Sequence, residues 1–204
     1  MKKVLIIYLS VLMIIIAGCS SDKKNNEKTP DISDNISSME ILIDNNLIKV
    51  TNKLTYKDLE KMGFNLDENY AGVLEKTVPP SKNAKSINIE SFNIKTSKDK
   101  LISISVVNTG KKDCAVKDAT VYFIGTYNVK EYDHSYILPS KIKYGNTAKD
   151  MKEAWGEPQV DLTSLADGKM IQYVNSDCTF TANLDNAGKM ESFSFMLDTN
   201  KLLN

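Results

Sequence analysis

Arginine is absent from this 204-residue chain, so all 26 basic residues are lysine, and they are balanced by 26 acidic residues. The lysines and the acids are interspersed along the sequence, and no block of one sign forms a polybasic arm. A nucleic-acid-binding surface needs a basic patch or stripe that neutralises phosphates. We therefore expect no nucleic-acid partner.

Residue patterns that support catalysis are also scarce. The one histidine, His134, lies in the polar segment 131–136. We interpret it as a solvated linker residue, because its neighbours in sequence rarely hold the geometry of a Ser–His–Asp triad, which is the alternative. The chain has no G-x-S-x-G elbow, P-loop or G-x-G-x-x-G motif, and Asp161, Asp167 and Asp185 are too scattered for a calcium loop. These absences predict no catalytic residue, no metal and no cofactor, although two carboxylates that meet in space could still make a small hydrolase.

Long hydrophobic runs are missing except at the N-terminus. Residues 4–16 form an apolar run that follows the basic pair Lys2 and Lys3. The run is shorter than the roughly 20 residues that a membrane-spanning helix needs. Its length, its basic start and the small residues after it are typical of a secretory signal.

The run ends in Ile-Ala-Gly-Cys, with Gly18 directly before Cys19. This ending resembles the lipobox of bacterial lipoproteins. The resemblance implies a signal peptide of residues 1–18, cleavage between Gly18 and Cys19, and a diacylglyceryl group on the Cys19 thiol. The alternatives are an uncleaved membrane anchor and an ordinary signal with a chance cysteine. Two acyl chains hold a protein stably on a membrane, whereas one binds marginally, so we expect anchoring on the outer face of the cell membrane.

After Cys19 the composition is polar up to Ser38, with no aromatic residue and two isolated isoleucines. Such a segment buries too little apolar surface to offset the entropy lost on ordering. We therefore expect residues 19–38 to form a disordered tether after the lipid. Without residues 1–18 the chain has 24 lysines against 26 acids, a net charge near −2.

Two further cysteines, Cys114 and Cys178, lie in a chain that we expect to be exported, where disulfides can persist. One reading joins them in a disulfide, and the other leaves two separate buried thiols. Two cysteines without a histidine neighbour do not make a zinc site, which usually takes four nitrogen or sulfur ligands.

Residues 55–63 and 147–156 share a pattern: T-x-x-D, apolar residues three positions apart, and a final glycine. The threonine oxygen can accept from a free backbone N–H, and the aspartate lies in the first turn, where negative charge is favoured. Glycine ends such a helix, and Pro158 prevents the second one from continuing. Helices this short are unstable alone in water, so we expect both to pack on a sheet.

Apolar and β-branched runs, several of them alternating with polar residues, predict the strands of that sheet. We expect strands at residues 87–89, 92–94, 101–106, 120–127, 170–174, 178–184 and 190–197. The Asp-Asn-Ala-Gly turn at 185–188 predicts that the last two strands form a hairpin. Each half thus reads as a helix followed by antiparallel strands. We expect an α+β fold of two tandem repeats, residues 39–135 and 136–204, each with a short helix or helix pair packed on an antiparallel sheet.

The region 138–197 carries an ordered set of motifs: I-K-Y-G-N-T-A-K-D-M into the helix, A-W-G-E-P at its end, then a tyrosine-bearing strand and an aromatic strand. This order resembles clostridial-type extracytoplasmic lipoproteins, the outer-membrane-assembly lipoproteins of the SmpA/OmlA type, and the tandem-repeat β-lactamase inhibitor protein. The first half matches only at the helix and at residues 113–116. The resemblance implies a helix-on-sheet fold in two copies that serves protein binding or scaffolding. Trp155 also has a plain structural reading, as a core residue at the helix end.

Several tyrosines cluster around the expected junction of the two halves. They are Tyr122, Tyr127, Tyr132, Tyr136 and Tyr144. Tyrosine offers a large contact area at low entropic cost, so the cluster suggests a partner surface. Packing within the sheet and at its edges is the alternative.

The leading interpretation is a non-enzymatic, lipid-anchored extracytoplasmic protein that binds another envelope protein or acts as a scaffold. An accessory subunit of an envelope assembly or transport complex is the second, and a small hydrolase is the third. The abundance of Asn, Ile and Lys indicates a low-GC genome, which suggests a low-GC Gram-positive cell.

Overall fold

The computed structural model describes residues 31–84, 86–96, 98–126, 136–164 and 168–203. Within them the protein forms an eight-stranded, a three-stranded and a two-stranded sheet, together with short helices. Every paired strand in this part of the chain is antiparallel to its neighbour. The expected α+β class, with antiparallel sheets and short helices, is confirmed. None of the helices in these ranges is long and apolar enough to cross a membrane.

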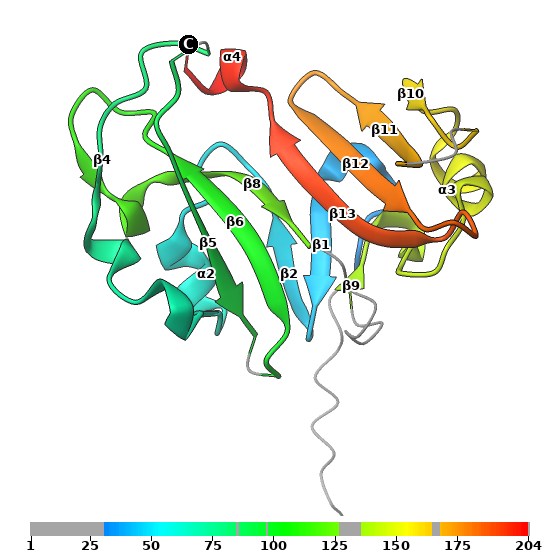
Figure 1. The fold of residues 1–204 in the computed structure, drawn as a ribbon, viewed down its shortest axis with the longest axis horizontal. Coiled ribbons are helices and arrows are strands. Elements are labelled where there is room, and N and C mark those ends of the chain that lie inside the picture. Colours follow the sequence, from blue (N-terminus) through cyan, green and yellow to red (C-terminus); the bar gives the residue numbers. More distant parts are fainter. Residues whose placement is uncertain (1–30, 85, 97, 127–135, 165–167, 204) are drawn as a thin grey trace, which may run out of the picture.

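The eight-stranded sheet takes strands from both halves of the chain, in the order β10-β11-β12-β13-β8-β6-β5-β3 (Figure 1). In that order the strands are Val160–Asp161, Met170–Val174, Cys178–Leu184, Met190–Leu197, Thr120–Gly125, Leu101–Val107, Ile89–Lys95 and Asn65–Leu66. Strands β11, β12 and β13 match the expected ranges, and the hairpin of β12 and β13 is confirmed. Strand β5 is one continuous strand where two short ones were expected.

The seam between the halves is the pair β13–β8, where Ser194 lies opposite Gly125. A Cβ atom on residue 125 would come within 2.6 Å of the Phe193 carbonyl oxygen, so only glycine fits this close approach. The expected halves 39–135 and 136–204 therefore share a continuous hydrogen-bonded sheet.

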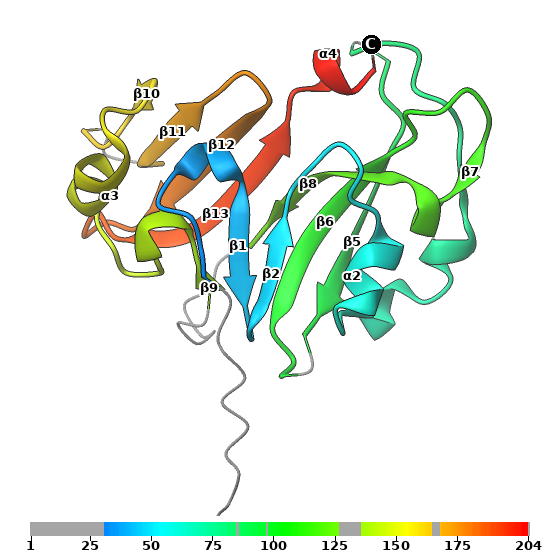
Figure 2. The same ribbon diagram turned by 180° about the vertical axis from the view of Figure 1, so that it is seen from behind.

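The three-stranded sheet has the order β2-β1-β9, with β2 at Asn46–Lys49, β1 at Glu40–Ile43 and β9 at Tyr136–Ile137. Asp44 and Asn45 make the β1–β2 turn, and both have the positive φ angles (47° and 68°) that a type I′ hairpin turn requires. This small sheet lies on one face of the large sheet (Figure 2). All four residues of β1 are buried, so the small sheet forms the centre of the second layer.

The hydrophobic core lies between the large sheet and this second layer. The small sheet supplies Ile41, Ile43 and Ile48, and the large sheet supplies Phe92, Ile94, Ile104, Ile124, Phe180 and Phe195. Burial of these side chains is the main favourable term in folding.

Two short helices complete the second layer: α2 at Tyr56–Lys61 and α3 at Ala148–Trp155. In α3 the Thr147 N–H donates to the Asp150 carboxylate (2.6 Å), and the Asp150 N–H donates to Thr147 Oγ1 (3.3 Å). A capping box also begins α2. Gly156, with φ 82°, follows the last residue of α3. Both expected helices are thus confirmed, with their caps.

The remaining elements are short. They are the pair β4 (Thr77–Val78) and β7 (Cys114–Ala115), helix α4 (Thr199–Leu202), and the 3₁₀ turns η2 (Ile36–Ser38), η3 (Glu68–Tyr70), η4 (Val73–Glu75), η5 (Val116–Asp118) and η6 (Pro139–Lys141).

Residues 31–38, which fall within the expected tether, lie against the folded body. The Ser140 N–H donates to the Ser33 carbonyl oxygen (3.0 Å), and the Ser140 hydroxyl donates to the Asp34 carbonyl oxygen (2.7 Å). The Ser33 N–H in turn donates to Glu40 Oε2 (2.9 Å). The ordered body therefore includes residues that sequence composition assigned to the tether.

Candidate functional site

One face of the eight-stranded sheet carries no helix or strand in the described part of the chain. Figure 2 shows the opposite face, with β1, β2 and α2 in front of the sheet, and Figure 1 looks onto the free face. The free face is referred to below as the open face. Strand register places two rows of side chains across its centre. One row is Val174, Thr179, Met196, Phe123, Ser105 and Ser91, and the other is Gln172, Thr181, Ser194, Gly125, Ser103 and Asn93.

These two central rows contain no charged residue. A quarter of the whole chain is charged, so a neutral area of this extent differs from the rest of the surface. The cores of protein–protein interfaces are likewise depleted of charged residues.

Several polar side chains of the open face are hydrogen-bonded to one another across neighbouring strands. On one half of the sheet Ser91 pairs with Ser105 (2.8 Å), and the Ser103 hydroxyl donates to Asn93 Oδ1 (2.6 Å). On the other half Gln172 Nε2 donates to Thr181 Oγ1 (3.1 Å), and Asn183 Nδ2 donates to Ser192 Oγ (2.8 Å). A polar group that already has a partner is less costly to remove from water. A covering partner can therefore desolvate these pairs at a lower cost than unpaired polar side chains.

Apolar side chains add to this face. Val174 (46% exposed) and Met196 (44% exposed) lie in one row with the half-buried Phe123. Phe123 and Tyr70 also line a shallow hollow above β5 and β6. The open face thus combines exposed apolar groups with paired polar ones, which suits contact with another macromolecule.

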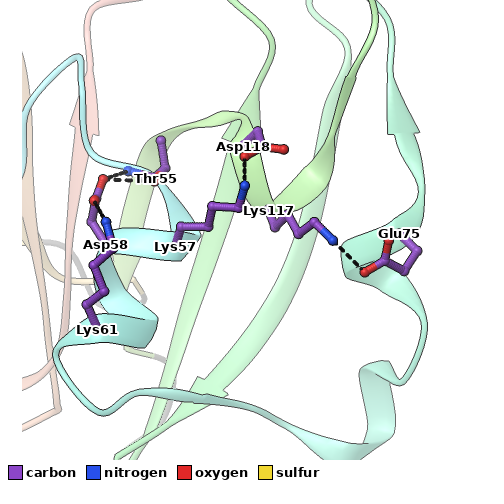
Figure 3. A network of polar contacts seen from close by, with 7 residues as sticks. All are labelled: Thr55, Lys57, Asp58, Lys61, Glu75, Lys117 and Asp118. Carbon is purple, nitrogen blue, oxygen red and sulfur yellow. Dashed lines mark hydrogen bonds and ion pairs between the residues drawn. The ribbon is translucent and has the colours of Figure 1, made fainter.

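Ion pairs are found instead elsewhere on the fold, some of them around the helices. Figure 3 shows such a group beside α2, where Lys57 pairs with Asp118, and Lys117 pairs with Glu75 (2.7 Å). The Thr55 hydroxyl and N–H donate to the carboxylate of Asp58 and hold its pKa below the usual value. These pairs join η4, η5 and α2 at the surface.

An acid–base centre would need titratable groups brought together in a cleft. The paired groups of Figure 3 lie at the protein surface. In the described ranges, no cluster of three or more His, Cys, Asp or Glu residues could hold a metal ion. His134 lies outside those ranges.

The expected tyrosine surface is wrong at two of its five positions, because Tyr136 and Tyr144 are buried. Tyr136 donates to the Leu101 carbonyl oxygen (3.0 Å), and its ring meets Tyr144 edge-on at 5.5 Å. The Tyr144 hydroxyl pairs with the Thr126 hydroxyl, and burial raises its pKa. Pairing of β9 with β1 places Tyr136 in the core, so these rings stabilise the fold and do not face a partner.

Tyr122 is half-buried in β8, and Tyr127 and Tyr132 lie outside the described residues. Gly18 and Cys19 of the expected lipidation site also lie outside them.

The disulfide between Cys114 and Cys178 is not formed: both are free thiols. Cys114 lies in β7 of the two-stranded sheet, and Cys178 begins β12 of the large sheet. Burial raises the pKa of Cys178 to about 12 and also raises that of Cys114. Both thiols are therefore protonated at neutral pH and are poor nucleophiles.

The sequence predicted only part of the open face. The alternation of serine with apolar residues in 101–106 and 190–197 predicted one buried and one wet side for each strand. That these wet sides form a single neutral surface depends on the β8–β13 seam, which no local pattern reveals.

Comparison of the chain with protein-family models, with curated proteins and with solved structures finds no match.

Proposed function

We propose that this chain is a lipid-anchored extracytoplasmic protein, without catalytic activity, that binds another protein of the bacterial envelope through the open face. The observation that carries the binding surface is the neutral centre of the eight-stranded sheet, where several polar side chains pair with one another across neighbouring strands. The location rests on the signal-like N-terminus and on Cys19.

We further propose that the two halves are diverged copies of one unit, as the resemblance to SmpA/OmlA-type lipoproteins suggests. Helix α2 precedes β3, β5, β6 and β8, and helix α3 precedes β10, β11, β12 and β13. From each edge of the sheet to the β13–β8 seam, the four strands of each unit follow in chain order. The last strand of one unit, β8, therefore pairs with the last strand of the other, β13. Both helices begin with a T-x-x-D capping box. Pairing two units in this way doubles the width of the open face.

The anchor is tested by growing cells with labelled palmitate. The wild-type chain should carry label and remain with the membrane, and Cys19→Ser should lose both. Cys114→Ser is the matched control and should keep both. A wild-type chain without label would contradict the lipid anchor. So would mass spectrometry that finds residues 1–18 still attached to the chain.

The binding surface is tested with a photo-crosslinking amino acid placed at single positions in living cells. Thr181 and Ser103 lie on the open face in different halves, and Lys149 is an exposed control on α3. Crosslinks from both open-face positions should reach the same envelope protein, and those from the control should not.

The variant Met196→Lys adds a second test, because it places a charge in the neutral row. That charge would have to lose its water when the partner covers the open face. It should reduce the open-face crosslink at least tenfold while Lys149→Glu leaves it unchanged. Crosslinking that is equal at all three positions, or insensitive to Met196→Lys, would exclude the open face as the binding surface.

A further inference from the structure

Residues 31–38, referred to below as the strap, lie against the body directly before β1. Their one helical element is the single turn η2, and none of their side chains is buried. Ile36 alone among them packs partly against the hydrophobic core. The strap therefore gains little free energy from burial of apolar surface.

The hydrogen bonds that hold the strap to the body are concentrated at its start. Ser140 supplies two of them, from its N–H to the Ser33 carbonyl oxygen and from its hydroxyl to the Asp34 carbonyl oxygen. Further along, the strap bonds to itself, since Asn35 Oδ1 accepts from the Ser37 N–H (2.9 Å) and the Asn35 carbonyl from the Ser38 N–H (2.9 Å). The internal bonds can persist when the bonds to Ser140 break, so the strap can move as a unit.

Packing between the strap and the body is incomplete. A hollow of about 170 Å³ is lined by Asn35, Ile36 and Ser37 of the strap and by body residues that include Trp155 and Tyr173. Side chains that face such a gap lack the dispersion contacts of a close-packed interior. The strap is therefore held less tightly than the layers of the core.

The backbone is strained where the strap meets the body. Six non-glycine residues of the described chain have positive φ, and three of them lie here: Met39 (54°), Ser140 (55°) and Lys141 (61°). The other three are aspartate or asparagine in turns between paired strands, and these residue types tolerate the left-handed region. Methionine, serine and lysine adopt it at a cost, and such strain often marks segments that change conformation.

Met39 is placed to act as the hinge. Its carbonyl oxygen accepts from the Val50 N–H (2.9 Å), which fixes that end of the residue beside the small sheet. Its N–H bonds back to the Ile36 carbonyl oxygen within the strap (3.1 Å). Rotation about the N–Cα bond of Met39 therefore swings the strap without moving β1, and it also relieves the unfavourable φ angle.

We propose that the strap is a releasable extension of the tether: residues 31–38 leave the body together, by rotation at Met39, while the sheets stay folded. Weakly held segments open in this way below the free energy of global unfolding. Release adds eight residues to the link between Cys19 and the body, or up to about 28 Å of reach. This consequence for reach rests on the proposed lipid anchor, whereas the release itself does not.

Hydrogen exchange followed by mass spectrometry tests the release on the full chain in detergent micelles. Strap amides should be protected, yet they should exchange roughly a hundredfold faster than those of β1, which is paired on both sides. The variant Cys19→Ser cannot carry the lipid and should give the same rates. A failed anchor would therefore leave this test intact.

Substitution at the docking residue provides the second test. Ser140→Ala removes the hydroxyl bond to Asp34, so the strap should exchange about fivefold faster while β1 is unchanged. Ser164→Ala, at an exposed serine before β11, is the control and should alter neither rate.

Three results would overturn the proposal. Equal exchange of strap and β1, or equal acceleration of both by Ser140→Ala, would make the strap part of the cooperative body. Strap amides without any protection would mean that it never closes. A strap rate that ignores Ser140→Ala would mean that Ser140 does not hold it.

Discussion

Gly125 and Ser194 lie opposite each other at the seam of the eight-stranded sheet, and their backbones approach too closely for a side chain at residue 125. An ideal Cβ there would lie 2.6 Å from the Phe193 carbonyl oxygen and 2.8 Å from Ser194 Cβ. The Phe193 carbonyl also accepts from the Thr126 N–H (2.9 Å), so it cannot move freely. The close approach of β8 and β13 at this point thus requires glycine at residue 125.

We therefore expect Gly125→Ala to destabilise the protein by about 2–3 kcal/mol, because the added methyl forces a backbone shift at a buried position. Urea unfolding followed by circular dichroism measures the change. Gly110→Ala is the control, since its Cβ would meet mainly the end of the Asn108 side chain (3.1 Å). Equal losses in the two variants would contradict a specific role for the seam.

A buried ion pair fixes the small sheet to the large one. Lys100 Nζ lies 3.1 Å from Asp44 Oδ1, and the two side chains are only 9% and 4% exposed. Asp44 is in the β1–β2 turn, and Lys100 precedes β6. Removing one member of such a pair leaves an uncompensated buried charge, which is more costly than losing a surface pair.

We expect Lys100→Met to lower the free energy of unfolding by about 2–3 kcal/mol. Lys98 also approaches Asp44 (3.5 Å), but its side chain is 67% exposed, so Lys98→Met should cost less than about 1 kcal/mol. Chemical denaturation of both variants separates the two contributions. If Lys98→Met were the more damaging change, the assignment of Lys100 as the principal partner would be wrong.

Locally encoded elements were predictable from the sequence. Helices α2 and α3 follow from a threonine cap, an aspartate three residues later and a terminal glycine, all within ten residues. Strands β11 and β12 follow from composition and short-range pattern, and their observed bounds equal the expected ones.

The β1–β2 hairpin was not predicted, although Asp44 and Asn45 between two apolar runs carry a hairpin signal. Strand β1 is buried on both sides, so its sequence Glu-Ile-Leu-Ile lacks the alternation by which half-buried strands are recognised. Its partner β9 lies in the second half of the chain, at Tyr136–Ile137. The same long-range pairing explains why Tyr136, which follows a polar segment in the sequence, lies in the core and not at the surface.

Acid should weaken the capping box of α3. Hydrogen bonds from the Thr147 N–H and hydroxyl hold the pKa of Asp150 below its usual value. Because the folded-state pKa lies below the unfolded value of about 3.9, the carboxylate contributes stability that is fully present above that pH. The contribution is lost as the pH falls through the folded-state pKa.

The variant Asp150→Asn lacks this titration. The stability difference between wild type and variant should therefore be largest at pH 5 to 7 and shrink steadily toward pH 2, as measured by urea unfolding at each pH. Glu153→Gln, in the same helix but with only an exposed pair to Lys149, is the control. If the difference in unfolding free energy between wild type and Asp150→Asn did not change with pH, the cap would act without the charge of Asp150.

The free state of Cys114 and Cys178 predicts a distinctive pattern of thiol reactivity. Cys178 is buried at the start of β12, and its pKa of about 12 leaves roughly one thiolate in ten thousand at pH 8. Cys114 is half-buried, and burial raises its pKa too, with the negative charges of Asp118 and Asp113 adding to the effect.

Iodoacetamide at pH 8 should therefore modify Cys114 slowly and leave Cys178 intact until urea unfolds the chain, when both react at similar rates. Peptide mass spectrometry locates the labels, and Cys114→Ser should abolish the slow native-state reaction. Recovery of a Cys114–Cys178 linked peptide from unreduced protein would contradict both the free thiols and the separate places of β7 and β12 in the fold.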